Sequence, residues 1–275
     1  MEVVMHCFLR FPGWKDKAMT LSYDDCVCYD ERLIRIMQKY GLKGTFNVNA
    51  GLMGTTRRMD EKTAVQLYQD ADMEVGMHGY KHHYITACSN ADVWSEFYQD
   101  KLELERIFGV MIRGGAYAYG VYNDHAINVL KSLGVEYFRT TVSTHRFDLP
   151  EDWMKLNPTC HHREKIEELF NEFIAEQPDK IYYKNPKLFY LWGHSYEFND
   201  NDNWDVIENF GKKVAERTDI WHATNIEICE YVKAYKELVF SAKGDKVMNR
   251  STLDIYLWID GKNVLAKTGK VSDIL

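Results

Sequence analysis

A regular alternation of short apolar runs with amphipathic helical segments constrains the fold of this chain more than any other feature. Residues 17–23 have the pattern of a strand and residues 30–41 that of a helix, and the same order recurs as far as residue 238. About eight strand-then-helix units are typical of a (β/α) barrel. An open doubly wound sheet is the alternative, but no glycine-rich phosphate fingerprint follows the first strand. The sequence therefore predicts an α/β protein, a distorted (β/α) barrel of seven or eight strands.

The end of the chain has a different pattern. Residues 252–269 alternate apolar and polar side chains around an Asp260-Gly261 turn, which predicts a β-hairpin. We therefore expect a barrel over residues 1–240 and a C-terminal β extension over residues 241–275, packed on the barrel. The 275 residues of the chain suffice for one such barrel. Within the barrel, a sixth and weaker strand is expected near residues 152–157.

Composition and charge restrict the partners and the location of the protein. The net charge is −7 and no basic stripe is present, which argues against nucleic acid as a partner. The six cysteines are scattered and form no Cys-x-x-Cys pair, as expected for reduced thiols. The first residues lack the pattern of a signal peptide, and no apolar run approaches the roughly 20 residues of a membrane span. We therefore expect a cytoplasmic protein without membrane contacts. Export of a longer precursor is the alternative, and the oligomeric state is left open.

Polar residues recur where the predicted strands end. They are Asp24 and Asp25 after the first strand, His78 after the third, residues 117–120 after the fourth, Thr140 and Thr141 after the fifth, and His194 at the end of the strand at 187–194. The carboxyl ends of strands carry the chemistry in β/α barrels, because their loops converge on one mouth. The sequence therefore predicts one site built from segments that are far apart in the chain.

Two histidines in this set have the spacing of metal ligands. His78 and His82 are four residues apart, so a helical turn brings both imidazoles to one side. With one carboxylate they would supply the three protein ligands of a zinc-type site and leave a position open for water and substrate. His83 is the alternative to His82, and the competing interpretation is a polar loop with surface histidines.

The adjacent carboxylates Asp24 and Asp25 also allow two interpretations. They can form a turn that caps the following helix. Alternatively, one binds a metal ion and the other acts as a general base, since the cation offsets the repulsion between them. His194 lies between an apolar strand and a polar segment, and is either structural or catalytic.

Together these residues resemble the motifs of the polysaccharide deacetylase (NodB-homology) family of carbohydrate esterases. The segment SYDDC at 22–26 stands in the place of the first motif, Thr-Phe-Asp-Asp-Gly, and HGYKH at 78–82 in that of the second, His-Ser/Thr-x-x-His. The segment AYAYG at 116–120 loosely matches Arg-x-Pro-x-Gly, and WGH at 192–194 loosely matches Leu-x-His. The order of the motifs agrees with that of the family.

The resemblance implies a metal-dependent hydrolase on a distorted (β/α) barrel. The ligands of a divalent metal, most often zinc in this family, would be Asp25, His78 and His82. Asp24 would be the base that takes a proton from metal-activated water. The backbone N–H of Tyr119 would help to hold the oxyanion, and His194 would be the acid that protonates the leaving amine.

Four positions depart from the family motifs. Cys26 replaces the glycine of the first motif, and Gly79 replaces the Ser or Thr of the second. In the third motif, Ala116 and Ala118 stand where the family has Arg and Pro. The missing arginine would normally steady the base. Its place can be taken by one of two arginines elsewhere in the chain, Arg113 or Arg139.

We therefore expect a deacetylase that removes N-acetyl or O-acetyl groups from an acetylated sugar, a short glycan or another small acetylated substrate. The alternatives are a hydrolase of a non-sugar C–N bond, such as a cyclic amide, and a catalytically silent glycan-binding barrel. Aromatic rings can stack on sugars but are as often part of a core, and His161 can face the mouth or begin a helix. The candidate substrate-binding residues are Trp192, Tyr196, Trp204, His161 and Arg139.

Overall fold

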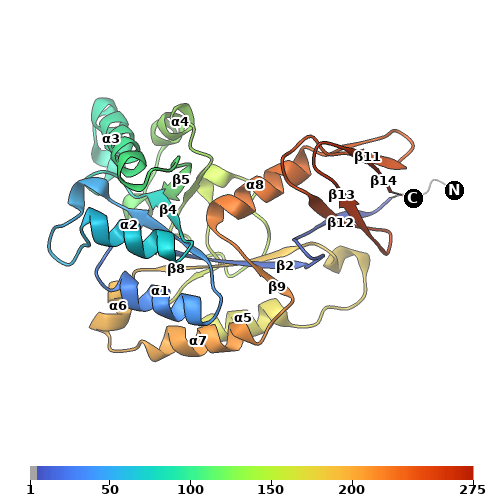
Figure 1. The fold of residues 1–275 in the computed structure, drawn as a ribbon, viewed down its shortest axis with the longest axis horizontal. Helices are drawn as coiled ribbons and strands as arrows, with labels where there is room; N and C mark the ends of the chain where they lie inside the picture. Colours follow the sequence, from blue (N-terminus) through green and yellow to red (C-terminus); the bar gives the residue numbers. More distant parts are fainter. Residues whose placement is uncertain (1–4, 275) are drawn as a thin grey trace.

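The computed structural model describes residues 5–274 and contains the predicted parallel sheet, which is curled (Figure 1). Seven strands lie in the order β6-β5-β4-β3-β2-β8-β7, and β9 pairs with the first half of β2. All of these strand pairs are parallel. The predicted α/β class with a distorted barrel is thereby confirmed. The strands of this sheet are β2 (Lys17–Asp24), β3 (Gly44–Val48), β4 (Glu74–Met77), β5 (Gly114–Ala116), β6 (Tyr137–Arg139), β7 (Cys160–His161), β8 (Lys187–Gly193) and β9 (Ile220–His222).

Helices connect the strands and cover the sheet. In Figure 1, α1, α5, α6 and α7 lie along one side of the sheet, and α3 and α4 lie on the other. The α-helices are α1 (Asp30–Lys39), α2 (Glu61–Asp70), α3 (Asn90–Phe108), α4 (Asp124–Ser132), α5 (Ile166–Ile174), α6 (Ser195–Asp200), α7 (Asp205–Ala215) and α8 (Asn225–Lys236). Short 3₁₀ turns are η1 (Ala50–Leu52), η2 (Ile85–Ala87), η3 (Ala118–Gly120), η4 (Trp153–Lys155) and η5 (Ile181–Tyr183).

Strand β2 has different chemistry on its two faces, because successive side chains of a strand point to opposite sides. On one face the side chains join the buried apolar core that the strands form with the helices, and they are Met19, Leu21 and Tyr23. On the other face, the side-chain amide of Asn47 on β3 donates to the hydroxyl of Ser22 and to the carboxylate of Asp24. The polar face of β2 therefore leads along the strand into the predicted site.

The segment around Leu156 lies along the outer strand β6. Leu156 forms a parallel bridge with Arg139, and its N–H donates to the carbonyl of Phe138 at 3.0 Å. The prediction of a strand near residues 152–157 is wrong for the first half of this segment, which forms the 3₁₀ turn η4. The carboxylate of Asp152 accepts the N–H of Met154 and thereby favours a turn over an extended backbone.

A small β module lies beside the barrel, with two antiparallel sheets of strand orders β1-β12-β13 and β10-β11-β14. The predicted hairpin is β12–β13, and its turn residues Asp260 and Gly261 both have positive φ, as a type I′ turn requires. Because β1 pairs with β12, the module takes strands from both ends of the chain. Its strands are β1 (Cys7–Arg10), β10 (Val239–Phe240), β11 (Lys246–Met248), β12 (Ile255–Ile259), β13 (Lys262–Ala266) and β14 (Val271–Asp273).

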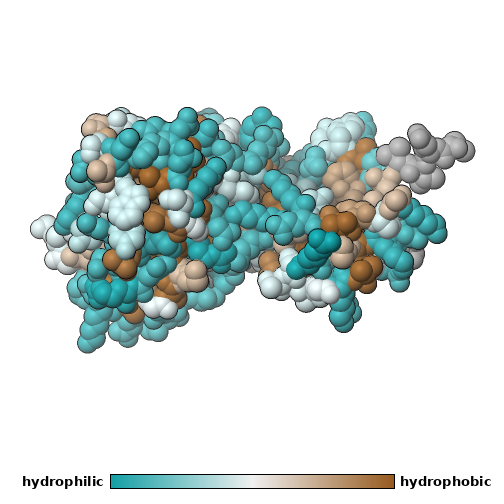
Figure 2. Space-filling model, turned by 90° about the horizontal axis from the view of Figure 1, so that it is seen from above, coloured by the Kyte–Doolittle hydropathy of each residue, from teal (hydrophilic) through white to brown (hydrophobic). Residues whose placement is uncertain are grey.

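Helix α8 joins the module to the barrel. Its residues Ile228 and Tyr231 belong to a second apolar core that also contains Leu257 of the module and Tyr190 of β8. Figure 2 shows the module as a smaller lobe beside the barrel, with hydrophilic residues over much of this face. No helix within residues 5–274 is long and apolar enough to cross a membrane.

Candidate active site

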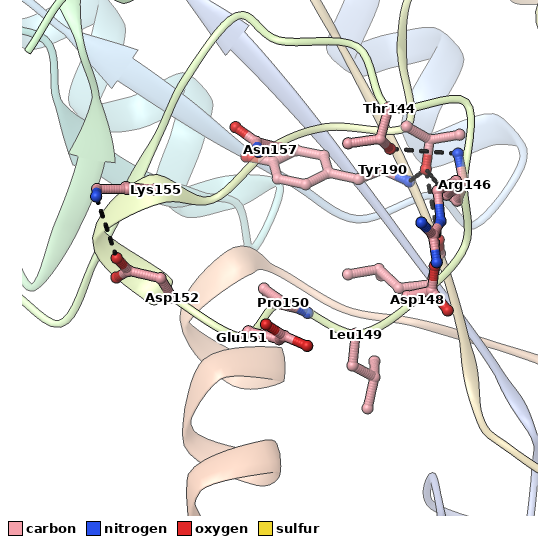
Figure 3. A pocket seen from close by; sticks show the side chains of 12 residues that line it. Thr144, Arg146, Asp148, Leu149, Pro150, Glu151, Asp152, Lys155, Asn157 and Tyr190 are labelled. Atoms are coloured by element: carbon pink, nitrogen blue, oxygen red, sulfur yellow. Dashed lines mark hydrogen bonds and ion pairs between the residues drawn. The ribbon is translucent and has the colours of Figure 1, made fainter.

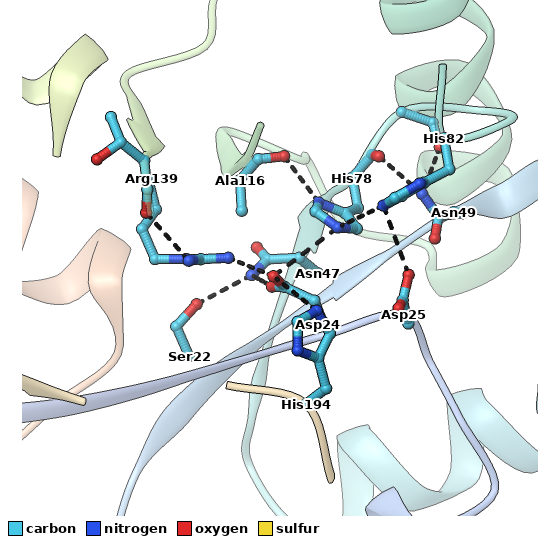
Figure 4. Close-up of polar contacts among 12 residues, drawn as sticks. Ser22, Asp24, Asp25, Asn47, Asn49, His78, His82, Ala116, Arg139 and His194 are labelled. Atoms are coloured by element: carbon cyan, nitrogen blue, oxygen red, sulfur yellow. Dashed lines mark hydrogen bonds and ion pairs between the residues drawn. The ribbon is translucent and has the colours of Figure 1, made fainter. Parts of the chain in front are cut away.

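Polar side chains from several strands meet at the carboxyl ends of the sheet (Figure 4). Asp24 is the last residue of β2 and Arg139 the last of β6. His78 directly follows β4, and His194 directly follows β8. Because all of these strands are parallel, their ends lie at the same edge, and the positional argument from the sequence brings together side chains up to 170 residues apart.

Asp24 is buried among cations and hydrogen-bond donors. The guanidinium of Arg139 pairs with its Oδ2 atom, and Nδ2 of Asn47 donates to Oδ1 at 2.8 Å. The Nε2 atoms of His78 and His194 lie 3.8 Å and 3.9 Å from Oδ2. Burial alone would raise the pKa of Asp24, but Arg139 and the two histidines hold it well below its usual range. Asp24 is therefore ionised at physiological pH.

Arg139 pairs with Asp24, the predicted base, and so makes the contact expected of the arginine that the third motif of this chain lacks. Its side chain is 0% exposed, and its guanidinium lies 4.3 Å from the ring centroid of Trp192. The cation is thus enclosed between Asp24 and an aromatic face, a favourable surrounding for a buried arginine. The structure places Arg139 beside the base and not among the side chains that face solvent.

Two alternatives that the sequence left open differ in their contacts. Arg113, the other candidate for the missing arginine, pairs instead with two glutamates, Glu136 and Glu230. His83, the alternative to His82, has its Nδ1 atom 3.2 Å from Oε2 of Glu96 and lies outside the ligand group. The contacts therefore favour Arg139 beside the base and His82 in the ligand group.

Asp25, His78 and His82 form a group that fits a metal ion, since one ligand atom of each lies within 4.8 Å of the others. Nδ1 of His78 lies 2.9 Å from the carbonyl oxygen of Ala116. A carbonyl can only accept, so this nitrogen carries the proton and Nε2 keeps its lone pair for a metal. Burial and the neighbouring His78 lower the pKa of His82 to about 4. His82 is therefore available as a neutral ligand, and two imidazoles with a carboxylate suit zinc.

The loops that carry these ligands have left-handed backbone at residues other than glycine. Asp25, Cys26 and His82 have φ angles of 86°, 52° and 59°, and such strain is typical of functional sites. Cys26 stands where the family has glycine, the residue that this conformation favours. Gly79 has a φ of 82°, and a Cβ atom there would lie only 2.8 Å from Oε1 of Glu96. The backbone conformation therefore explains the glycine at position 79, whereas Cys26 adopts a left-handed conformation that glycine would adopt with less strain.

A carboxylate on the following helix faces His194. Nδ1 of His194 lies 3.6 Å from Oε2 of Glu197, and the Nε2 atoms of His161 and His162 each lie 3.0 Å from the same oxygen. Burial would lower the pKa of His194, but Glu197 and Asp24 outweigh it and the pKa is raised. His194 therefore stays protonated to a higher pH than a free histidine.

His161, His194 and Glu197 form a second group whose possible ligand atoms all lie within 4.8 Å of one another, but the contacts of His161 and Glu197 argue against a metal ion there. The backbone N–H of Arg163 donates to Nδ1 of His161 at 3.1 Å. That nitrogen must then be unprotonated, so a neutral His161 carries its proton on Nε2, the atom that faces Glu197. The guanidinium of Arg163 also lies 2.7 Å from Oε1 of Glu197 and adds a positive charge. The carboxylate therefore has cationic and donor partners already.

The alkaline limb of the pH profile tests this arrangement. We expect kcat/KM to fall as His194 loses its proton, and we expect Glu197→Gln to move this fall to lower pH, because the variant lacks the charge that raises the pKa. The measurement is the pH dependence of kcat/KM for the two proteins. Asp200→Asn is the control, since its carboxylate lies on the same helix but pairs with Arg57. An unchanged alkaline limb in Glu197→Gln would contradict the role of this carboxylate.

Tyr119 lies at the mouth of the site. Its φ is 58°, its side chain is 59% exposed, and its ring centroid lies 4.5 Å from that of His82. The ring of Tyr84 lies next to it at 5.7 Å. The turn that carries the predicted oxyanion N–H is therefore in contact with a predicted metal ligand.

Three of the candidate substrate-binding side chains border His194. Its ring centroid lies 5.1 Å from that of Tyr196, 5.8 Å from that of Trp192 and 6.4 Å from that of His161. Trp192 and His161 also contact each other edge to face at 4.6 Å. Of these rings, Trp192 and His161 are buried.

Trp204 has a different surrounding. It belongs to the apolar core, with its ring centroid 5.3 Å from that of Phe198 and the guanidinium of Arg32 at 4.5 Å. The structure therefore places Trp204 in the packing between α1, α6 and α7. Its ring lies in the core and not with the other aromatic rings that the sequence analysis considered for sugar binding.

Several residues of the site were missed by the sequence analysis. Asn47 and Asn49 lie at the end of β3, where the rule that identified the other strand ends could have found them. Glu197 follows His194 by three residues, the spacing of neighbours on a helix. Arg58 contacts Asp25 from a loop that has no recognisable pattern.

A separate pocket of about 520 Å³ lies along the segment 144–159 and the start of β8 (Figure 3). Its charged side chains pair with each other, Arg146 with Asp148 and Lys155 with Asp152, and none of these pairs is buried. The pocket shares no residue with the converging group at the strand ends. It therefore offers no comparable arrangement for catalysis.

Comparisons with known proteins agree with the motifs. Residues 13–138 match the family model described as polysaccharide deacetylase. A candidate polysaccharide deacetylase from Mycobacterium smegmatis shares the fold with a TM-score of 0.61 and 17% identity, over 86% of this chain and 96% of that chain. A family 4 carbohydrate esterase from Streptomyces lividans, solved with acetate, has a TM-score of 0.51 and 16% identity, over 76% of this chain and 93% of that chain.

Other matched structures include pseudoenzymes, and one of them is covered only in part by this chain. A mutant of a family 4 pseudoenzyme from Bacillus anthracis has a TM-score of 0.53 and 15% identity, over 81% of this chain and 70% of that chain. The chain spans 61% of the length of a Streptococcus pyogenes deacetylase that it also matches. No curated protein matches the chain. At these identities the solved structures show the fold alone, and the polysaccharide deacetylase model matches residues 13–138, which is less than half of this chain.

Proposed function

We propose that this chain is a metal-dependent deacetylase that removes N-acetyl or O-acetyl groups from an acetylated sugar or short glycan. The observation that carries the proposal is a three-ligand group, Asp25, His78 and His82, that adjoins an ionised Asp24 and a His194 whose pKa is raised. The match of residues 13–138 to the polysaccharide deacetylase model supports the same reaction class.

The ligand group is suited to hold a divalent ion and leave part of it open. When bound, such an ion supplies Lewis acidity to a water molecule and to the acyl carbonyl. His78 is fixed for this task by the carbonyl of Ala116, and Asp25 by the guanidinium of Arg58 at 3.1 Å. Three protein ligands leave room for water and substrate.

Asp24 and His194 divide the proton transfers. Asp24 accepts the proton of the attacking water, and its Oδ2 atom lies 3.8 Å from the Nε2 atom of His78. Arg139 keeps Asp24 ionised, at the expense of its strength as a base. His194, 3.9 Å from the same oxygen, gives its proton to the leaving amine or alcohol. The backbone N–H of Tyr119 is the proposed donor to the oxyanion.

A second candidate reaction is the hydrolysis of a non-sugar C–N bond, such as that of a cyclic amide. The altered third motif favours it, since Ala116 and Ala118 are small where the family has Arg and Pro. A catalytically silent glycan-binding barrel is the third candidate. The presence of both Asp24 and His194 argues against it, because binding alone needs neither a base nor an acid.

Metal content and acetate release test the proposal together. We expect about one divalent ion per chain, held by Asp25, His78 and His82, and acetate release from an acetylated amino sugar only in the loaded protein. An anomalous-scattering map locates the ion, and an acetate assay follows the reaction. His78→Gln is expected to lose the ion and the activity. His83→Gln is the matched control and should keep both, because His83 pairs with Glu96 outside the ligand group.

The three candidate functions give different outcomes. A protein that binds no stoichiometric ion and is not activated by added zinc would contradict the metal-dependent mechanism. Opening of cyclic amides without any acetate release would favour the second candidate. Binding of glycans by a parent protein that turns over none of these substrates would favour the silent barrel.

A further inference from the structure

Arg58 connects the two loops that carry the proposed metal ligands. Its Nη2 atom lies 3.1 Å from Oδ1 of Asp25, and its Nη1 atom donates to the backbone carbonyl of the same residue. Nη1 also donates to Oδ1 of Asn49 at 2.9 Å. Since Asp25 has a left-handed φ of 86°, one guanidinium holds both its strained backbone and its carboxylate.

Asn49 carries this connection on to the second loop. Its Nδ2 atom donates to the carbonyls of His78 and Gly79 at 2.7 Å and 2.8 Å. Its side chain uses donors and acceptor alike, and the residue is 1% exposed. On the N–H side of His78, the carboxylate of Asp100 accepts at 3.0 Å. The backbone of His78 is therefore held from both sides by side chains that are not ligands.

Backbone pairing fixes the position of Arg58 itself. Arg58 forms an antiparallel bridge with Val27. The N–H of Met59 donates to the carbonyl of Cys26 at 3.0 Å, and the N–H of Cys28 donates to that of Arg57 at 2.9 Å. The loop before α2 thus lies along the turn that carries Asp25.

We propose that Arg58 and Asn49 are positioning residues that hold Asp25 and His78 in their metal-binding arrangement. The inference rests on the proposed function in taking these residues as ligands. Partners that orient metal ligands typically contribute 10- to 100-fold to metal affinity. The charge of Arg58 has the opposite effect, because it repels a cation. A positioning role therefore predicts weaker metal binding when the contacts are lost, and a purely electrostatic role predicts tighter binding.

Zinc affinity of the chelator-stripped protein tests the proposal. We expect Asn49→Ala, which changes no charge, to weaken zinc binding by about 10- to 100-fold. Arg58→Lys keeps the charge but cannot form the planar fork, so we expect a loss of the same order. The double variant should lose less than the product of the two, because both residues act through one set of contacts. Competition with a chromophoric chelator measures each dissociation constant.

Arg57→Lys is the matched control. Arg57 is the neighbouring residue, but it pairs with Asp200 and lies over the ring of Tyr29. The zinc affinity of the Arg57→Lys variant should therefore equal that of the parent protein. Thermal unfolding reports whether each variant folds. If Asn49→Ala fails to fold, Arg58→Lys alone decides, since the Arg58 side chain is 18% exposed and tolerates the change more easily.

Unchanged or tighter zinc binding in both Asn49→Ala and Arg58→Lys would overturn the inference. His78→Gln separates this failure from that of the proposed function. Zinc binding that survives His78→Gln means that the ligand assignment is wrong. Zinc binding that is lost in His78→Gln but unaffected in the other two variants refutes the positioning role alone.

Discussion

Asp24→Asn is expected to lower kcat by about 10²- to 10⁴-fold while leaving the metal content unchanged. The substitution keeps the size of the side chain and an oxygen for Arg139, but it removes the ability to accept a proton. Asp24 is not in the three-ligand group, so its loss should not release the ion. Steady-state acetate release and metal analysis of the same samples measure the two effects.

The contrast with Asp25→Asn makes this expectation specific. Asp25 is in the ligand group, so we expect its replacement to lower metal content and activity together. Asp60→Asn is a control for the removal of one carboxylate, since Asp60 only caps α2 at the surface. A fully active Asp24→Asn protein would show that another group accepts the proton.

Arg139→Met is expected to lower the free energy of unfolding by about 3–5 kcal/mol. The change leaves Asp24, which is 2% exposed, as a buried carboxylate without its principal counter-charge. Urea unfolding of the parent and the variant at pH 7 measures the difference. Arg113→Met is the matched control: its ion pairs with Glu136 and Glu230 are partly exposed, and such pairs are worth about 0–1 kcal/mol.

The same comparison has a defined pH dependence. In the folded parent the pKa of Asp24 lies below its unfolded value of about 3.9, so the ion pair stabilises the fold above that pH and its contribution is lost as the pH falls through the folded pKa. We therefore expect the difference between parent and Arg139→Met to be largest near neutral pH and to narrow below about pH 4. A difference that does not change with pH would contradict the pairing with Asp24.

The order of the elements and the edge that carries the site could be predicted from the sequence. Alternating side chains such as Thr20, Leu21 and Ser22 identify β2, because the two faces of a strand repeat every second residue. Parallel strands end at one edge, so Asp24, His78 and His194 could be expected to meet without knowledge of any distance. The hairpin followed from its Asp-Gly turn in the same way.

Contacts between segments that have no pattern of their own could not be predicted. Trp204 has an aromatic ring of the kind that stacks on sugars, yet the packing of three helices encloses it in the core. Arg58 acts through Asp25, which is 33 residues away, and does not stand in a motif. The strand β1 pairs with β12 across almost the whole chain, which no local signal indicates.

The sequence by itself determined the α/β class, the approximate strand ends and the two carboxylates whose side-by-side placement required an explanation. Only the tertiary structure decided how those carboxylates differ: Asp24 is enclosed with Arg139 from β6, and Asp25 faces His82 and Arg58. The physical reason is that periodicity and turn chemistry depend on neighbours along the chain, whereas the charge of a buried carboxylate is set by cations that the fold brings from distant strands.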